Sequence, residues 1–354
     1  MKGQATLILD MMGAELGTNE VLRGVSQACA EMGSKCFHLV LVTADGAALE
    51  QAVEIELSAS CKRNCELEIV EAPQLLPREF SSPVDVYKKY PNCSIRRAMD
   101  VAKAAPRSAV ISAATTGLVM TSALFTLGRI PGIERPPIGT PMPTRSKQLF
   151  YVDGGSVVDC KPRHLYQFAV MAHLYVKGVR GVEHPTIALL SNGSEEYKGN
   201  QVVREASELI SADHNLNFVG FTEGHTMLSG DLDIMVCDGF LGNIVLKFAE
   251  GVAELMVGMM REELARDPLA GLAAKLFQKQ ALRRMFDRMD YSQFGGAPLL
   301  GLNGNVVICH GRSTARAYKN ALLVGYNLAE ANIFQQVAEY VADHPALASN
   351  GNSG

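Results

Sequence analysis

The fold is decided by residues 5–43, ATLILDMMGAELGTNEVLRGVSQACAEMGSKCFHLVLVT. Residues 5–10 form an apolar run of the kind found in buried strands. Residues 18–32 have the apolar spacing of a helix, and Gly33 is placed to stop it. Residues 38–43 predict a second buried strand. A strand, a helix and a strand in this order are the repeating unit of an α/β fold with a parallel sheet.

The same alternation continues along the chain. We expect further strands over 67–72 and 108–114, helices over 94–104 and 116–128, and an irregular surface segment over 73–94. Four later apolar runs end in Gly or Asp and precede a helix-compatible stretch; they occupy 149–155, 186–193, 217–224 and 233–239. The segment 306–313 repeats the arrangement near the end of the chain. The pattern predicts an α/β fold with a mostly parallel sheet covered on both faces, in which ligands bind beyond the carboxyl ends of the strands.

Composition and charge exclude some classes of protein. The chain has 354 residues, 47% of them apolar, with a net charge of −4, which excludes a disordered chain and argues against a general nucleic-acid binder. The absence of an eighteen-residue apolar run and of a signal-peptide layout at the start leads us to expect a cytoplasmic protein. We expect one α/β/α unit over 1–345, followed by a flexible tail over 346–354.

Several familiar kinds of site are missing from the sequence. There is no G-x-G-x-x-G fingerprint, Walker loop or G-x-S-x-G elbow, so no cofactor is expected. The eight cysteines are scattered and favour buried reduced thiols. Cys61 and Cys65 are the only close pair, and without a second pair nearby they do not predict a metal site.

Two strand ends in the first third of the chain are suited to an anionic ligand. Asp10 and Gly13 follow the first strand, where Gly13 allows a tight turn. Thr115, Thr116 and Gly117 open a helix whose free N–H groups favour a phosphate. Each segment is also compatible with an ordinary strand-to-helix turn.

A third strand end carries an unusual density of polar groups. Asp153, Gly155, Asp159 and Lys161 lie within nine residues, and Pro162 suits the first turn of a following helix. Lys161 can supply positive charge to a phosphate, and Asp159 can orient it. A solvated surface loop is the alternative interpretation.

A fourth strand end repeats this chemistry. It offers Glu195, Lys198 and Asn200 directly before a predicted helix. These residues can bind an anion or form a solvated turn.

The last two strand ends add groups that can polarise a ligand or transfer a proton. Asp238, Gly239 and Asn243 follow one strand, and Asn243 can donate to a ligand oxygen. His310 follows the apolar run near the end of the chain, which makes it a candidate for proton transfer. Turn formation and helix capping are again the alternative.

Residues 256–289 interrupt the alternation of strands and helices. Apolar residues there are interleaved with Lys and Arg, and Leu272 to Arg288 predict an amphipathic helical segment. It either packs on the core or in a dimer interface, or touches anionic lipid or an acidic partner.

At these segments the chain resembles the PlsX family, the phosphate acyltransferases of bacterial phospholipid synthesis. The motifs that carry the resemblance are LGRIPGIERP (127–136), VDCKPRHLYQFAVM (158–171), KGN (198–200), CDGFLGNIVLK (237–247), DYSQFGGAPLLGLNG (290–304) and HGRSTARAYKNA (310–321). The resemblance implies a three-layer α/β/α fold like that of isocitrate dehydrogenases and phosphotransacetylases. It also implies a homodimer at the inner membrane that works beside a membrane glycerol-3-phosphate acyltransferase.

The resemblance further implies a reaction in which acyl-acyl-carrier protein and inorganic phosphate give acyl phosphate and free carrier protein. Phosphate is then the nucleophile, so no protein nucleophile is needed, and the protein stabilises the oxyanion. Thr116, Gly117, Lys161 and Lys198 become the phosphate-holding candidates. Asp238 and Asn243 position or polarise the reacting groups, and His310 either transfers a proton or stabilises the oxyanion. The alternatives are a non-catalytic scaffold and a phosphotransacetylase-like enzyme that uses acyl-coenzyme A.

The chain departs from the family pattern at the strand ends. Thr115, Val157 and Ser191 stand where the family has Asn, and Leu241 stands where it has Thr. The opening D-A-M-G-G-D of the family is here DMMGAE, residues 10–15. Three amides and a hydroxyl are therefore replaced where the ligand is expected.

Overall fold

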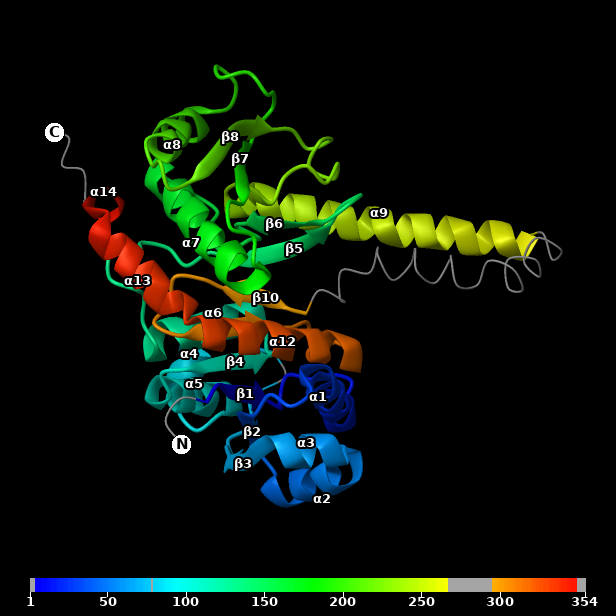
Figure 1. Ribbon diagram of the computed structural model, residues 1–354. Helices are drawn as coiled ribbons and strands as arrows, with labels where there is room; N and C mark the ends of the chain where they lie inside the picture. The colour runs from blue at the N-terminus through cyan, green and yellow to red at the C-terminus, as the bar shows by residue number, and fades with distance from the viewer. Residues whose placement is uncertain (1–3, 78, 267–294, 349–354) are drawn as a thin grey trace.

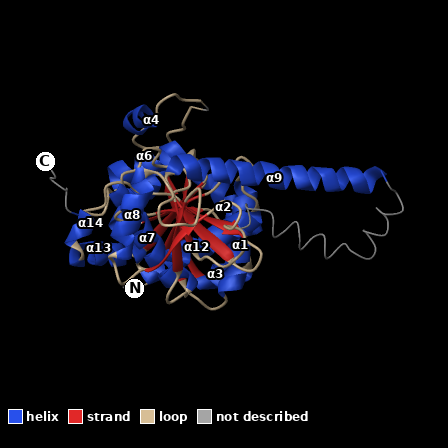
Figure 2. Cartoon of the chain, turned by 90° about the horizontal axis from the view of Figure 1, so that it is seen from above, coloured by secondary structure: helices blue, strands red, loops and turns tan. Residues whose placement is uncertain are grey.

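The protein, seen in a computed structural model, is built on two mostly parallel sheets that are each covered by helices on both faces (Figures 1 and 2). The structure describes residues 4–77, 79–266 and 295–348. The chain builds most of the first sheet, crosses to the second, and then returns to the first with its last two strands and a long helix. The predicted mostly parallel α/β/α architecture is thus confirmed, with the strands divided between two sheets.

The first sheet has the order β10-β11-β4-β1-β2-β3, and only β10 runs antiparallel to its neighbour. Its strands are β1 (Thr6–Asp10), β2 (Phe37–Thr43), β3 (Cys65–Glu71), β4 (Ser108–Ser112), β10 (Ala297–Leu299) and β11 (Asn305–Ile308). Alternate residues of β1 enter different layers of the core: Leu7 and Leu9 face one side, and Ile8 faces the other. This explains why the strand reads as a continuous apolar run.

Helices cover both faces of the first sheet. On the side of Leu7 lie α1 (Thr18–Met32) and α12 (Ala315–Ala331); on the side of Ile8 lie α5 (Ser94–Ala104) and α6 (Thr116–Thr126), with α4 (Pro83–Lys89) against α6. The helices α2 (Gly46–Glu56) and α3 (Ala59–Asn64) join β2 to β3. Helix α5 has the predicted bounds, and α1 ends at Gly33 as expected.

The second sheet has the order β5-β6-β9-β7-β8, with β5 antiparallel at one edge. Its strands are β5 (Gly139–Pro143), β6 (Gln148–Val152), β7 (Thr186–Leu190), β8 (Asn217–Thr222) and β9 (Ile234–Val236). It is covered by α7 (Pro162–Arg180) and α8 (Gln201–Ser211) on one face and by α9 (Gly239–Arg266) on the other. The C-terminal helices α13 (Ile333–Asp343) and α14 (Pro345–Ala348) pack against α7.

Helix α7 joins the two halves. Every residue from His164 to Val176 is buried, so this stretch has no solvent face. The helix packs on β6 and β9 of the second sheet and on α12, which covers the first. Pro162 occupies its first turn, as the sequence predicts.

Four features differ from the sequence-based expectations. The antiparallel strands β5 and β10 were not expected, because Pro141, Pro143 and Pro298 argue against a strand. Both strands lie at sheet edges, where proline is tolerated. The segment 73–94 is not wholly irregular, since it contains α4. The expected tail is wrong for residues 346–348, which belong to α14, where Leu347 is fully buried. Residues 349–354 lie outside the described residues.

The prediction of reduced thiols is wrong for one pair. Cys29 and Cys61 form a disulfide, although they lie 32 residues apart in the sequence. The other six cysteines are free, and four of them are buried: Cys65, Cys93, Cys237 and Cys309. The sequence alone did not bring Cys29 near Cys61, because the contact depends on how α1 packs against α3.

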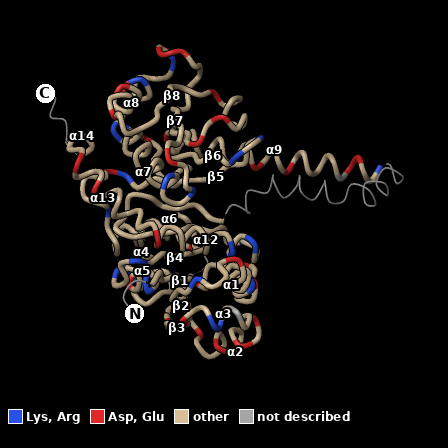
Figure 3. The backbone as a smooth tube through the Cα atoms, viewed as in Figure 1, with Lys and Arg blue, Asp and Glu red and all other residues tan. Residues whose placement is uncertain are grey.

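Helix α9 extends beyond the rest of the molecule (Figures 1 and 2). The protruding helical segment predicted from residue 256 is helical as far as Arg266, and residues 267–289 lie outside the described residues. In the ranges that the structure covers, no helix has the length and apolar character needed to cross a bilayer. Among the residues that the structure describes, Figure 3 shows basic and acidic residues interspersed over both halves.

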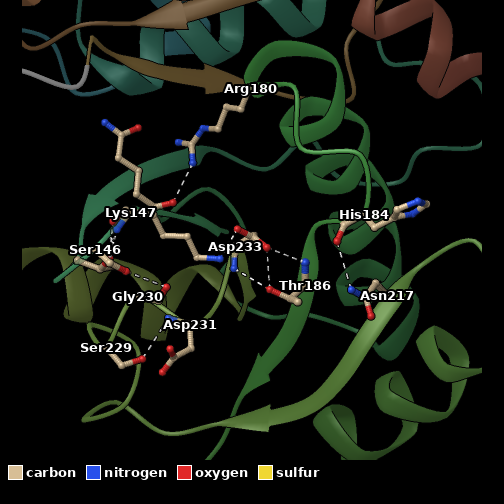
Figure 4. A network of polar contacts seen from close by, with 12 residues as sticks. Ser146, Lys147, Arg180, His184, Thr186, Asn217, Ser229, Gly230, Asp231 and Asp233 are labelled. Atoms are coloured by element: carbon tan, nitrogen blue, oxygen red, sulfur yellow. Dashed lines mark hydrogen bonds and ion pairs between the residues drawn. The ribbon is translucent and has the colours of Figure 1, made fainter.

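Asp233 organises the amino ends of the strands in the second sheet (Figure 4). Its Oδ2 accepts hydrogen bonds from the backbone N (3.0 Å) and Oγ1 (2.8 Å) of Thr186, and Lys147 Nζ pairs with its Oδ1. Burial acts to raise the pKa of Asp233, but the hydrogen bonds from Lys147 and Thr186 outweigh it and hold the pKa below its ordinary value. The carboxylate thereby joins β6, β7 and β9.

Replacing this carboxylate should destabilise the fold. We expect Asp233→Ala to lower the free energy of unfolding by about 2–3 kcal/mol, because a partly buried N–H and an ammonium lose their acceptor. Because the folded pKa is depressed, the stabilisation is present above the ordinary Asp pKa of about 4 and is lost as the pH falls through the folded value. Urea titrations of both proteins should therefore give curves that converge below about pH 4. The exposed neighbour Asp231 provides the control, since Asp231→Ala should change stability by less than about 0.5 kcal/mol.

Candidate functional site

The predicted site residues gather at the carboxyl ends of the strands, in one set for each sheet. The first set follows β1, β4 and β11 and contains Asp10, Gly13, Thr115, Thr116, Gly117 and His310. The second set follows β6, β7 and β9 and contains Asp153, Gly155, Asp159, Lys161, Glu195, Lys198, Asn200, Asp238, Gly239 and Asn243. This edge of a parallel sheet is where α/β proteins bind their ligands.

In the first set, Asp10 ties two strand ends together. Its carboxylate accepts hydrogen bonds from the backbone N of Met12 (3.2 Å) and from Ser112 Oγ (2.8 Å), and that hydroxyl accepts from the backbone N of Ala114 (3.1 Å). Burial raises the pKa of Asp10 against the opposing effect of these hydrogen bonds. Asp10 is 3% exposed, so its position is that of a residue that shapes the two loops.

The start of α6 is open to solvent beside these loops. Gly13 lies so close to the backbone of Ala113 and Ala114 that a side chain has no room there. Thr115, Thr116 and Gly117 are exposed, and the cap residue Thr115 makes no side-chain hydrogen bond to the helix. The first N–H groups of α6 are therefore available to an anion.

The segment after β11 completes the first set. The backbone N of Glu15 donates to the carbonyl of Gly311 (2.8 Å), which places this segment beside the loop after β1. His310 is exposed, and its Nδ1 accepts from the backbone N of Arg312 (3.2 Å). This hydrogen bond leaves Nε2 free to face a ligand or solvent.

In the second set, a fully buried carboxylate holds the loop that follows β6. Asp153 accepts hydrogen bonds from five donors: the backbone N of Ile138 (2.9 Å), Gly155 (3.1 Å), Ser156 (3.0 Å) and Val157 (2.6 Å), and Ser156 Oγ (2.8 Å). Burial raises the pKa of Asp153, and the hydrogen bonds oppose that rise. With its oxygens occupied by the loop, Asp153 has the position of a scaffold for the site.

The loop after β6 fits closely against the beginning of α9. A Cβ atom added to Gly239 would lie 2.6 Å from Asp153 Oδ2, and one added to Gly155 would lie 3.2 Å from Asn243 Cβ. The backbone N of Gly239 donates to the carbonyl of Val157 (2.8 Å). The structure therefore brings together the third and fifth segments singled out in the sequence.

Two charged residues of this loop face outward. Asp159 and Lys161 are exposed, and Lys161 is the cap residue of α7. The backbone N of Lys161 donates to Nδ1 of His164 (3.1 Å), whose Nε2 lies 2.9 Å from Oε2 of Glu134. The backbone at Lys161 is thus fixed while its ammonium group is left at the surface.

A cavity of about 640 Å³ lies between the fourth and fifth segments. It is lined by Leu190, Ser191, Asn192, Gly199, Asn200, Val203, Gly224, Cys237, Asp238, Leu241 and Val245. Two of the predicted residues therefore share it, and both also cap helices: Asn200 Oδ1 accepts from the N of Val203 (2.9 Å), and Asp238 Oδ1 accepts from the N of Leu241 (2.8 Å).

The apolar half of the lining was not predicted. Val203 lies in the first turn of α8, and Leu241 and Val245 lie one turn apart at the start of α9. The i, i+4 spacing of Leu241 and Val245 is the sequence signal that could have predicted their common face. Glu195 and Lys198 lie beside this cavity without lining it; Lys198 donates its backbone N to the carbonyl of Glu195 (2.9 Å).

Comparison with known proteins assigns the family. A family model described as fatty acid synthesis protein matches residues 5–336. The phosphate acyltransferase of Desulforamulus reducens is 39% identical over 334 residues, covering 94% of this chain and 96% of the relative. The phosphate acyltransferase of Pelotomaculum thermopropionicum is 37% identical over 346 residues, covering 98% of both. The chain belongs to the phosphate acyltransferase family.

Solved structures agree with this fold. A phosphotransacetylase from Streptococcus pyogenes has a TM-score of 0.61 at 17% identity, with 93% of this chain and 95% of that one covered. The EutD phosphotransacetylase from Staphylococcus aureus has a TM-score of 0.58 at 14% identity, covering 92% and 94%. At these identities the likeness concerns the fold.

The positions where this acyltransferase-family chain departs from the family pattern fall into two groups. Val157 uses its backbone, which donates to Asp153 and accepts from Gly239, while its side chain is buried in the core. Ser191, in place of an amide, and Leu241, in place of a hydroxyl, line the cavity and leave its wall less polar. An apolar residue at 157 is therefore compatible with the loop geometry, whereas the other two changes alter the cavity wall.

Loss of the Asp153 carboxylate should collapse the loop after β6. We expect Asp153→Ala to lower the free energy of unfolding by at least about 3 kcal/mol, since several buried N–H groups lose their acceptor at about 1–3 kcal/mol each. Chemical denaturation measures the change. Asp159→Ala, in the same loop but exposed, should shift stability by less than about 0.5 kcal/mol. Equal effects of the two substitutions would contradict the assigned role of Asp153.

Proposed function

We propose that the chain transfers a fatty acyl group from acyl-acyl-carrier protein to inorganic phosphate and releases acyl phosphate for glycerophospholipid synthesis. The observation that carries the proposal is the arrangement at the second sheet, where the helices α7, α8 and α9 begin at one edge and Lys161 and Lys198 precede two of them. Helix starts and ammonium groups are suited to a small anion. Membership in the family supports the reaction class.

The proposed step needs no nucleophile from the protein. A phosphate oxygen attacks the thioester carbonyl carbon, the new C–O bond forms, the C–S bond breaks, and the carrier's sulfur leaves and takes up a proton. Lys161 and Lys198 hold the phosphate, and the N–H groups at the helix starts stabilise the oxyanion. In this scheme His310 supplies or accepts the proton. Asp238 and Asn243 fix the first turn of α9.

The cavity provides a place for the apolar part of the donor. Leu190, Val203 and Val245 line it beside the polar groups of Asn192 and Asn200. An apolar wall with a few convergent polar groups is the usual form of a site that binds a small molecule with an apolar part. The cavity therefore fits an acyl thioester better than a wholly polar substrate.

The lysines provide the direct test. With long-chain acyl-acyl-carrier protein and radiolabelled phosphate, we expect Lys161→Ala and Lys198→Ala each to lower kcat about 10²-fold or more, because charge that stabilises the transition state is removed. Lys103→Ala is the matched control, since Lys103 is exposed in the last turn of α5, at the amino end of β4. Parallel reactions with acyl-coenzyme A identify a different donor. Folded protein that makes acyl phosphate from neither donor would indicate the scaffold alternative.

We also infer that α9 meets a second copy of the chain. The helix exposes a stripe of large apolar side chains, which are Leu241, Ile244, Phe248, Val252, Leu255, Met256 and Met259. Apolar exposure of this length marks an interaction surface. The described part of α9 carries more Glu than Lys and Arg, so it favours an apolar partner over anionic lipid.

Charge placed in the stripe should separate the copies. We expect Phe248→Glu combined with Leu255→Glu to convert a dimer into a monomer, because two carboxylates would be buried without partners. Light scattering after gel filtration measures the mass. Glu254→Ala, on another side of α9, should leave the mass unchanged. A native monomer at micromolar concentration would overturn the inference.

The remaining partner and localisation proposals depend on the basic segment. Peripheral contact with the inner membrane, and with a membrane glycerol-3-phosphate acyltransferase, rests on Leu272 to Arg288, which lie outside the described residues. The acidic carrier protein is expected to approach the same basic side chains. We also propose that the protein is located in the cytoplasm.

A further inference from the structure

Three cysteines from three elements meet in the core of the first half. Cys29 comes from α1, Cys61 from α3 and Cys65 from the start of β3. Cys29 and Cys61 are bonded, and Cys65 Sγ lies 3.5 Å from Cys61 Sγ. All three sulfur atoms lie within 4.8 Å of one another, and their residues are 1%, 0% and 9% exposed.

This sulfur cluster is separate from the acyl-transfer site. Cys65 is the first residue of β3, so it lies at the amino edge of the first sheet, whereas the site residues lie at the carboxyl edge. Strand β3 is also one of the two edge strands of this sheet. None of the site residues belongs to the cluster, which is the one group of three potential metal ligands among the residues that the structure describes.

A disulfide accounts for two of the sulfurs and leaves the third unexplained. Cys65 is a free thiol against the bonded pair; it pairs with Phe37 across β2 and β3 and belongs to the same apolar core as Leu57 and Val53. Thiolates select thiophilic d¹⁰ cations, and a dry site with sulfur ligands alone suits them best. Once the bond between Cys29 and Cys61 is reduced, the three sulfurs gathered at this point can coordinate one ion.

We propose that Cys29, Cys61 and Cys65, when reduced, form a three-sulfur binding site for a thiophilic cation of the zinc(II) or copper(I) class. The disulfide is the oxidised form of this site. Its reduction consumes two molecules of a small thiol, which become one small-molecule disulfide, and gives the thiols of Cys29 and Cys61. The cation then displaces the thiol protons to solvent as the sulfurs coordinate it.

A bound ion would cross-link three elements of the first half. Helix α1 follows directly on the loop that carries Gly13, and α3 and β3 form the outer edge of the same half. One ion would join α1, α3 and β3 at a single point, where the disulfide joins only α1 and α3. A cation that binds the folded chain and not the unfolded one also raises the midpoint of thermal unfolding.

The test uses the full-length chain, reduced with a phosphine and kept free of oxygen. Cobalt(II), as the spectroscopic substitute for zinc(II), is titrated first, followed by zinc(II) and copper(I) in competition. We expect one ion per chain with thiolate-to-metal absorption, and an affinity at least about 10-fold weaker in Cys29→Ser, Cys61→Ser and Cys65→Ser. The matched control is Cys36→Ser, because Cys36 is free and exposed.

Two results would overturn the proposal. One is reduced, folded native chain that binds none of the three ions; the other is binding that Cys65→Ser leaves unchanged. Circular dichroism confirms that each variant is folded, and Cys65→Ala serves as a second replacement if serine is not tolerated. The outcome does not depend on acyl transfer, so an inactive acyltransferase with an intact metal site remains distinguishable.

Discussion

The geometry of the second sheet depends on one buried carboxylate. Asp153 directly follows β6 and accepts hydrogen bonds from the N–H groups of the loop after it, so the chain must fold back on this side chain before it reaches α7. The same carboxylate lies where a side chain on Gly239 would have to go, which obliges α9 to begin close against the loop. A carboxylate without these donors would be costly to bury, so the loop and the strand end stabilise each other.

The rest of the site follows from that constraint. Once α9 starts at Gly239, its first turns place Leu241 and Val245 against the end of β7, and the cavity forms between α8 and α9. Helix α7 has its first residues fixed by the pair of His164 and Glu134. Because α7 is buried along most of its length, the site rests on a rigid support that reaches the other half of the molecule.

Much of this arrangement could be predicted from the sequence. Apolar runs ending in Gly or Asp identified the inner strands, because strands of a parallel sheet are buried on both faces and lack polar alternation. The edge strands β5 and β10 were missed because they contain proline, which argues against a strand. The strand ends were predicted as a group, but whether Asp153 faces a ligand or the protein is decided by neighbours such as Ile138, fifteen residues away. Local sequence does not carry that information.

The departures from the family pattern separate positions where the loop uses only the backbone from positions where it uses the side chain. At position 157 the loop uses only the backbone, whose N–H and carbonyl serve Asp153 and Gly239, so a valine can stand there while its side chain fills the core. At 191 and 241 the side chains themselves form the cavity wall, so Ser191 and Leu241 change what the cavity can hold. The loss of an amide at 191 and of a hydroxyl at 241 reduces the polar groups available to a ligand and increases the apolar surface, which in the proposed reaction favours the acyl part of the substrate. In the reaction we propose, the helix starts and Lys161 and Lys198, which the substitutions leave in place, would then be the main groups that hold phosphate.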